Sequence, residues 1–219
     1  MNGIKRDGAT VEDLRRAERS LGRRDPVLRR VIRDVGPTTI DSYWRRDAFA
    51  ALLQTMISQQ ISIHAAAAIH RRFKALYGGR SPSAKRLLAT SEDDLRAVGL
   101  SRPKAAYMRD LAEHVSSRRL VVSQLESMSD DAAIAALTAV KGIGVWTAEV
   151  FLIFRLGRLD VIPGDDLGLL EGVRQLYDMA ARPTPDELRT FAERWRPYRS
   201  VASWFIWQGR RLAMGVKTR

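Results

Sequence analysis

The fold of this chain is decided by KGIGVWTA, residues 141–148, a glycine-containing turn that leads into an apolar segment. Gly142 and Gly144 allow positive φ and let another molecule approach the backbone closely. Backbone amides of such a turn, at the start of a helix, form a site for a phosphate. The stretch therefore predicts a helix–hairpin–helix unit that binds a polyanion, with Val140 and Ile143 buried beneath it and Lys141 reaching a phosphate.

Two carboxylates, Asp165 and Asp166, follow the hairpin in a Gly/Pro turn before a new apolar segment. An Asp at this place often only caps the next helix. A helix N-terminus also favours an ionised carboxylate, and glycosidic cleavage passes through an oxocarbenium-like transition state that such a charge stabilises. The carboxylate can also orient or deprotonate the attacking water. A phosphate site followed by an acidic site points to chemistry performed on DNA.

The composition agrees with a polyanionic partner. The chain has 37 Lys and Arg against 25 Asp and Glu, a net charge of +12, which attracts nucleic acid. A solvated basic surface explains the charge equally well, and we interpret the arginine run between residues 15 and 33 mainly in that way. The absence of cysteine excludes disulfides, a Cys-ligated iron–sulfur cluster and a zinc knuckle. The histidines at 64, 70 and 114 form no convincing metal set, so we expect no metal and no cofactor.

No apolar run approaches the roughly 20 residues that span a bilayer, and Met1–Asp7 lacks the apolar core of a signal peptide. We therefore expect an intracellular protein without a membrane partner. It would be a cytoplasmic monomer, associated with the nucleoid through DNA.

Helical spacing extends over nearly the whole chain, and the strand-like runs at 120–122 and 160–162 are too short for a sheet. Thr10 is a predicted helix cap with Gly22 as its stop, and Asp25-Pro26 and Asp47 begin further helices. The fold class predicted is all-α, with two helical lobes and a cleft between them. We expect one unit over 1–219: a middle lobe at about 50–160 that contains the hairpin (130–156), and a second lobe from 10–49 and 167–214. Further helices are expected at 91–98, 102–116, 145–156, 167–177, 185–195 and 198–212.

Five pieces between about Asp25 and Arg211 resemble, in the same order, the helix–hairpin–helix (HhH-GPD) DNA glycosylases, and among them the 3-methyladenine DNA glycosylase II group. The pieces are MISQQIS (56–62), GLSRPKA (99–105), KGIGVWTA (141–148), PGDDLG (163–168) and WRPYRS (195–200). The resemblance implies the two-lobed helical fold of that family. It also implies that the partner is double-stranded DNA containing damaged bases.

The resemblance further implies roles for individual residues. The catalytic aspartate matches Asp166, with Asp165 as the less favoured alternative, and the residue that fills the gap left by the flipped nucleotide matches Gln60. The phosphate-binding hairpin is formed by Lys141, Gly142 and Gly144. The base pocket is expected to be lined by Trp146 and Trp207, with weaker candidates in Trp44 and Phe49.

The implied activity is removal of alkylated purines of the 3-methyladenine and 7-methylguanine type. The positive charge of these bases is attracted to an indole face. The base must be extruded from the stack before its N-glycosidic bond is broken. Bifunctional relatives carry a nucleophilic lysine where this chain has Trp146, so no Schiff base and no strand cleavage are expected. We also expect no additional N-terminal β-rich domain of the kind that larger members have.

Two alternatives stay open at this point. The first is a non-catalytic helix–hairpin–helix protein that binds DNA or senses damage, which has no need for the carboxylate of Asp166. The second is a related glycosylase specific for uracil, mismatched thymine or adenine.

Overall fold

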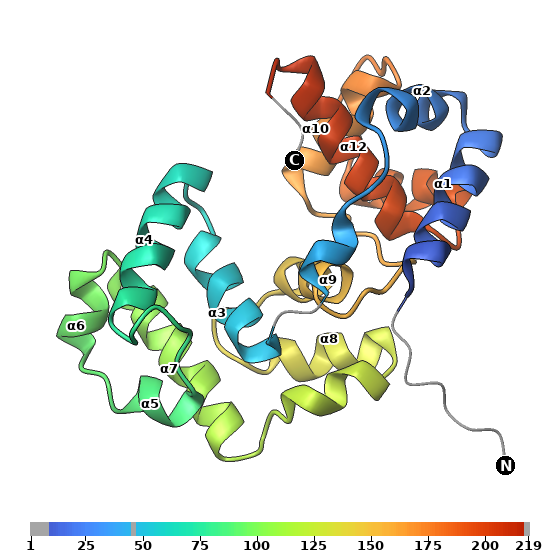
Figure 1. The fold of residues 1–219 in the computed structure, drawn as a ribbon. Helices are drawn as coiled ribbons and strands as arrows, with labels where there is room; N and C mark the ends of the chain where they lie inside the picture. Colours follow the sequence, from blue (N-terminus) through green and yellow to red (C-terminus); the bar gives the residue numbers. More distant parts are fainter. Residues whose placement is uncertain (1–8, 45–46, 217–219) are drawn as a thin grey trace, which may run out of the picture. The chain divides into compact units, whose positions relative to one another are not determined.

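The computed structural model describes residues 9–44 and 47–216, and every regular element in these ranges is a helix (Figure 1). The predicted all-α class is thereby confirmed. The chain divides into two compact units. Unit 1 holds the described residues up to Trp44 and those from Leu152 onward, and unit 2 holds Asp47 to Phe151, so that the division falls within helix α9 (Val145–Phe154).

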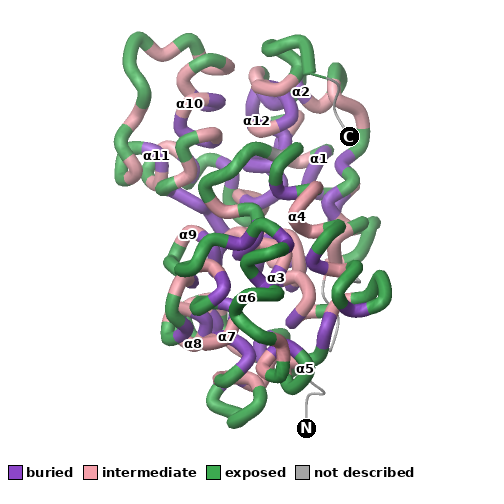
Figure 2. Tube along the Cα trace, turned by 90° about the vertical axis from the view of Figure 1, so that its left-hand side faces the viewer, coloured by how far each residue is buried: buried purple, intermediate pink, exposed green. Residues whose placement is uncertain are grey.

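Unit 1 is organised around its last helix. Helix α12 packs against three other helices of the unit, α1, α2 and α10, and against one short 3-10 turn, η3. Its residues from Ser200 to Ile206 are all buried (Figure 2). The elements of unit 1 are α1 (Val11–Arg24), α2 (Pro26–Val35), η1 (Ile40–Tyr43), α10 (Leu167–Leu176), α11 (Pro185–Ala192), η3 (Glu193–Trp195) and α12 (Arg199–Ala213).

Two glycines let these helices approach closely. A Cβ placed on Gly172 of α10 would lie 2.7 Å from Cγ2 of Ile206, and one on Gly209 of α12 would lie 2.9 Å from Cγ1 of Val31. Such distances are not tolerated between real carbon atoms. The small residues therefore set the spacing of α12 from α10 and from α2, and α10 is the helix that begins at Asp166.

Unit 2 is built on helix α7, which packs against α3, α5 and α6. Its core includes Leu52 and Met56 of α3, Phe73 of α4, and Met108 and Leu111 of α7, all almost fully buried. The elements of unit 2 are α3 (Ala48–Ser58), α4 (Ile63–Ala75), α5 (Ala84–Leu88), α6 (Glu92–Ala97), α7 (Arg102–Ser116), η2 (Val122–Ser127), α8 (Asp130–Thr138) and the first part of α9.

Most helix starts follow the capping rules. The Thr10 hydroxyl accepts the N–H of Asp13 while the Asp13 carboxylate accepts the N–H of Thr10, and Asp47 caps α3. The predicted stop at Gly22 is wrong, because α1 continues to Arg24. The helix ends at Asp25 instead, whose backbone is extended (φ −129°, ψ 109°) as expected for a residue before proline.

Asp25 is also the most heavily bonded buried carboxylate of unit 1. Its Oδ1 accepts the N–H groups of Val27 and Leu28 at 3.0 and 3.1 Å. Its Oδ2 accepts the Tyr177 hydroxyl at 2.6 Å and the Trp195 indole N–H at 3.2 Å. Burial, and then the bond to Asp25, raise the pKa of Tyr177 far above its ordinary value, so the hydroxyl remains a donor. One side chain thus joins the start of α2 to the ends of α10 and η3.

This arrangement predicts a graded loss of stability. Asp25→Ala removes a helix cap and leaves buried donors without an acceptor, and should cost about 3 kcal/mol of unfolding free energy. Tyr177→Phe removes one hydroxyl from the same network and should cost about 1 kcal/mol. Urea denaturation of both variants and the parent protein measures the difference. Equal losses in the two variants would contradict the role assigned to the cap and the indole.

Candidate functional site

Asp166 stands at the start of helix α10 as its N-cap. Its Oδ1 accepts the backbone N–H of Leu169 at 2.6 Å and the indole N–H of Trp207 at 2.9 Å. Both donors present positive partial charge to the carboxylate, as does the N-terminus of the helix. The side chain is only half-buried. Asp166 is therefore a positioned carboxylate that remains accessible at the surface of unit 1.

An aromatic row lies behind this carboxylate. The ring of Trp207 stacks on Phe154, with centroids 5.7 Å apart and an interplanar angle of 24°. The edge-on partner of Phe154 is Tyr43, at 5.4 Å. Trp207 is thus held by its N–H and by one ring face, and its side chain is half-buried. Unlike Trp207, Phe154 and Tyr43 carry no signal in the sequence that separates them from core aromatic residues.

Asp165 has a different environment from its neighbour. It is exposed, and its Oδ2 forms an ion pair with Arg189 of α11 at 2.6 Å. Arg189 also pairs with Asp186 at 3.1 Å. An exposed pair of this kind has little energetic weight. The geometry favours Asp166 over Asp165 for work at a reacting atom, because only Asp166 is oriented by both a helix terminus and an indole.

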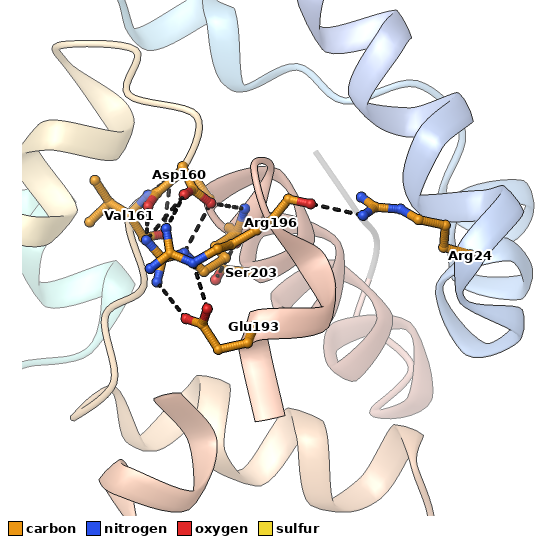
Figure 3. Close-up of polar contacts among 8 residues, drawn as sticks. Arg24, Asp160, Val161, Glu193, Arg196 and Ser203 are labelled. Atoms are coloured by element: carbon orange, nitrogen blue, oxygen red, sulfur yellow. Dashed lines mark hydrogen bonds and ion pairs between the residues drawn. The ribbon is translucent and has the colours of Figure 1, made fainter. Parts of the chain in front are cut away.

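The segment before the two aspartates is fixed by the WRPYRS piece, as Figure 3 shows. Arg199 Nε donates to Oδ1 of Asp160 at 2.9 Å, and Arg196 donates to Oδ2 at 2.8 Å. Glu193 accepts from Arg199 at 3.2 Å, and its hydrogen bond with Arg196 lowers the pKa of the Glu193 carboxyl. Ser200 exchanges two hydrogen bonds with the backbone of Val161. The chain that leads to Asp166 is therefore attached to the start of α12.

The hairpin between α8 and α9 belongs to unit 2. Gly142 has φ 81°, and a Cβ there would lie 2.4 Å from the ring of Tyr107, so this position requires glycine. Gly144 does not have a positive φ, and a Cβ placed there would meet no atom within 4 Å. Val140 and Ile143 are buried as predicted.

Some hairpin amides are already bonded and others are available. The N–H of Lys141 donates to Asp110 Oδ2 of α7 at 2.9 Å, and the N–H of Ile143 donates to the carbonyl of Val140. Within the described part of the chain, the N–H groups of Gly142 and Gly144 make no hydrogen bond. The Lys141 side chain is exposed. Two amides and an ammonium thus lie at the start of α9, and groups of this kind are able to bind an anion.

Gln60 lies in the turn that follows α3, is exposed, and has a left-handed backbone (φ 57°). Its neighbour Gln59 reaches the hairpin, donating from Nε2 to the Gly142 carbonyl at 3.1 Å and to Thr147 Oγ1 at 3.0 Å. The Gln60 turn and the hairpin are therefore joined within unit 2. Gln59 could not be recognised from the sequence, because a contact across 83 residues leaves no local signal.

The aromatic residues expected in a base pocket are divided between the units. Trp44 and Trp207 belong to unit 1, where Trp44 packs its ring on Gly157 and its buried Nε1 has no hydrogen-bond partner among the described residues. Trp146 and Phe49 belong to unit 2, and Trp146 is half-buried in the first turn of α9 while Phe49 is buried in α3.

Within the described ranges, no group of three or more His, Cys, Asp or Glu side chains is placed to hold a metal ion. None of the helices in those ranges combines the length and apolar character that a membrane crossing requires.

Comparison with known proteins shows where this chain belongs. Residues 53–197 match the family model described as HhH-GPD superfamily base excision DNA repair protein. DNA-3-methyladenine glycosylase 1 of Schizosaccharomyces pombe is 32% identical over 206 residues, which cover 93% of this chain and 90% of the relative.

Solved structures agree. The S. pombe 3-methyladenine DNA glycosylase Mag1 in complex with abasic DNA superposes with a TM-score of 0.81 at 32% identity, covering 88% of this chain and 95% of the other. A DNA-3-methyladenine glycosidase from Bacillus halodurans gives a TM-score of 0.78 at 34% identity, covering 92% and 93%. The chain belongs to the HhH-GPD superfamily of base excision DNA repair proteins, in its 3-methyladenine DNA glycosylase group.

Proposed function

We propose that the protein is a monofunctional DNA glycosylase that extrudes alkylated purines of the 3-methyladenine and 7-methylguanine type from double-stranded DNA and hydrolyses their N-glycosidic bonds. The observation that carries the proposal is the Asp166 carboxylate at the start of α10, held by the Trp207 indole N–H. Relatives named as 3-methyladenine DNA glycosylases support it.

The chemistry needs a negative charge beside the sugar. As the bond between C1′ and the base nitrogen breaks, the electron pair leaves with the base and positive charge develops on the sugar. Asp166 stabilises that charge and orients a water molecule, whose oxygen bonds to C1′ while its proton passes to the carboxylate and on to solvent. The products are a neutral free base and an abasic site in an intact strand. An alkylated purine is already cationic, so it leaves without a strong general acid.

Base selection would come from the aromatic side chains. An indole face attracts a cationic ring by about 0.5–2 kcal/mol. Trp207 is suited to this because its ring adjoins Asp166 and is backed by Phe154. Trp146, Trp44 and Phe49 are the further proposed pocket residues. Hairpin residues Lys141, Gly142 and Gly144 would hold the DNA backbone, while Gln60 fills the gap left by the extruded base.

The absence of lyase activity is part of the proposal. The family position of the nucleophilic lysine is occupied by Trp146, which forms no Schiff base. Lys141 precedes the glycines of the hairpin, and its backbone is held by Asp110. The Lys104 ammonium donates to the backbone carbonyls of Ile57 and Gln59, just before Gln60. Borohydride should therefore trap no covalent complex of protein and DNA.

The first catalytic prediction concerns the two adjacent aspartates. Asp166→Asn should reduce base release from methylated DNA by about a hundredfold or more, because electrostatic stabilisation of this kind is worth on the order of 3 kcal/mol. Asp165→Asn is the matched control and should stay near the parent rate, since Asp165 only pairs with Arg189 at the surface. Single-turnover excision, with the freed bases separated by chromatography, measures both. An inactive Asp165 variant beside an active Asp166 variant would reverse the assignment.

The hairpin glycines should behave differently from each other. Gly144→Ala should leave thermal stability unchanged, because the new methyl meets no protein atom within 4 Å. The affinity of this variant for damaged and undamaged duplex should fall by about tenfold. The methyl group would hold the phosphate away and weaken the charge-assisted bond from the amide. Gly142→Ala should destabilise the free protein, because its φ is 81° and Tyr107 occupies the space. Calorimetry and duplex titration separate the two. Loss of affinity for damaged DNA alone would place Gly144 in lesion recognition.

Trp207 should contribute in two separable ways. Trp207→Phe keeps an aromatic face but removes the N–H bond to Asp166, and should slow excision of every substrate by a similar factor, about tenfold. Trp207→Ala also removes the face, and should add a loss of up to about tenfold that is larger for cationic 7-methylguanine than for neutral hypoxanthine. Parallel single-turnover assays on the two lesions test this. A charge-selective loss in the Phe variant would assign selectivity to the indole N–H instead.

A further inference from the structure

The turn that carries Gln60 has a conformation that needs support. Helix α3 ends at Ser58, and two residues later Gln60 has φ 57°, a region that residues with a Cβ rarely occupy. Gln60 is exposed, so burial of its own side chain does not fix it. Such a backbone persists only where its surroundings hold it in place.

Lys104, in the first turn of α7, supplies part of that support. Its Nζ donates to the carbonyl of Ile57 at 2.7 Å and to the carbonyl of Gln59 at 2.6 Å. Carbonyls at the end of a helix have no hydrogen-bond partner within the helix. A cation placed there is attracted to the negative end of the helix dipole and stabilises the helix. Desolvation lowers the pKa of Lys104. A single ammonium thus holds the peptide group that directly precedes Gln60.

Gln59 ties the same turn to the hairpin. Its Nε2 donates to the Gly142 carbonyl and to the hydroxyl of buried Thr147. Gly142 is therefore held from two sides, since the ring of Tyr107 lies against its other face. Lys104, Tyr107 and Asp110 are three residues apart along α7 and share one face of it. That face contacts the Gln60 turn through Lys104 and the hairpin through Tyr107 and Asp110.

We propose that Lys104 and Gln59 are positioning residues for base extrusion, which lock the Gln60 turn to the phosphate-binding hairpin so that backbone binding and insertion into the duplex act as one rigid element. The inference rests on the proposed function, because it takes Gln60 as the residue that fills the gap. Neither side chain touches the reacting sugar in this role. Their loss should impair extrusion while sparing the bond-breaking step and general affinity for DNA.

The variants to compare are Lys104→Met, Gln59→Ala, Gln60→Ala and the double variant Lys104→Met/Gln60→Ala. Lys85→Met is the matched control, because Lys85 is an exposed lysine of α5 in the same unit. Lys104→Arg tests rescue, since a guanidinium can donate to both carbonyls. Thermal melting comes first. If Lys104→Met does not fold, Gln59→Ala and its double variant with Gln60→Ala replace it.

Excision is measured under single turnover for one alkylated base in duplex and in single-stranded DNA. Lys104→Met and Gln59→Ala should each slow duplex excision by about tenfold or more, as misplacement of a working group does. Excision from the single strand should stay near the parent rate, because no stacked partner has to be displaced. In the Gln60→Ala background, Lys104→Met should cause no further loss. Lys104→Arg should recover most of the activity, and Lys85→Met should match the parent.

Equal losses on both substrates, or a Lys104 effect that adds fully to that of Gln60→Ala, would overturn the proposal. A fall in affinity for undamaged duplex would also overturn it, because Lys104 would then act through the hairpin alone.

Extrusion is measured separately, by the increase in 2-aminopurine fluorescence beside an abasic analogue when the protein binds. If the parent protein brightens the probe, the variants do not, and no base is released from methylated DNA, the proposed function fails while the positioning role stands. Equal brightening by parent and variants refutes the positioning role.

Discussion

A carboxylate at the start of a helix, bonded to an indole N–H, is the arrangement on which unit 1 depends, and it occurs twice among the described residues. Asp25 caps α2 and accepts from Trp195, while Asp166 caps α10 and accepts from Trp207. The helix supplies backbone donors and positive partial charge, and the indole fixes the carboxylate from a distant part of the chain. The two sites share a local design but differ in exposure.

That difference in exposure separates a structural role from a proposed chemical one. Asp25 is buried, and both of its oxygens accept hydrogen bonds from protein groups. Asp166 is half-exposed at the surface of unit 1. A buried carboxylate saturated with donors stabilises packing, whereas an oriented carboxylate at an accessible position can meet a substrate. The network of Asp160, Arg196 and Arg199 holds the segment that leads to Asp166 (Figure 3).

In unit 2, one face of helix α7 has the joining role that a helix-capping carboxylate has in unit 1. Three side chains of α7 contact the Gln60 turn and the hairpin, which are more than 80 residues apart in sequence. The two glycines of the hairpin differ in what the protein itself requires of them. At Gly142 the backbone conformation and the Tyr107 ring require it, while at Gly144 the free protein leaves the space open. Gly144 is therefore the hairpin position at which we propose that a DNA phosphate approaches the backbone closely.

Helix starts and the all-α class could be predicted from the sequence, because they depend on interactions between residues close together in the chain. Caps such as Thr10, Asp25-Pro26 and Asp47 mark helix starts because their side chains bond to amides two or three residues away, and the all-α class follows from hydrophobic spacing. Motif order was sufficient to identify the family. Gly22 does not end α1, because glycine costs a helix only about 1 kcal/mol, whereas the residue before a proline is strongly biased away from the helical region.

The tertiary structure alone decided which groups act on one another. Trp207 bonds to Asp166 across 41 residues, and Lys104 reaches the carbonyl of Ile57 across 47. Such pairs depend on how helices pack, for example on the close approach of α12 to α10 that Gly172 permits. Hydrophobic spacing shows which face of a helix is buried, but not which neighbour it meets. The contacts that join distant segments are therefore a property of packing, which no local pattern of residues encodes.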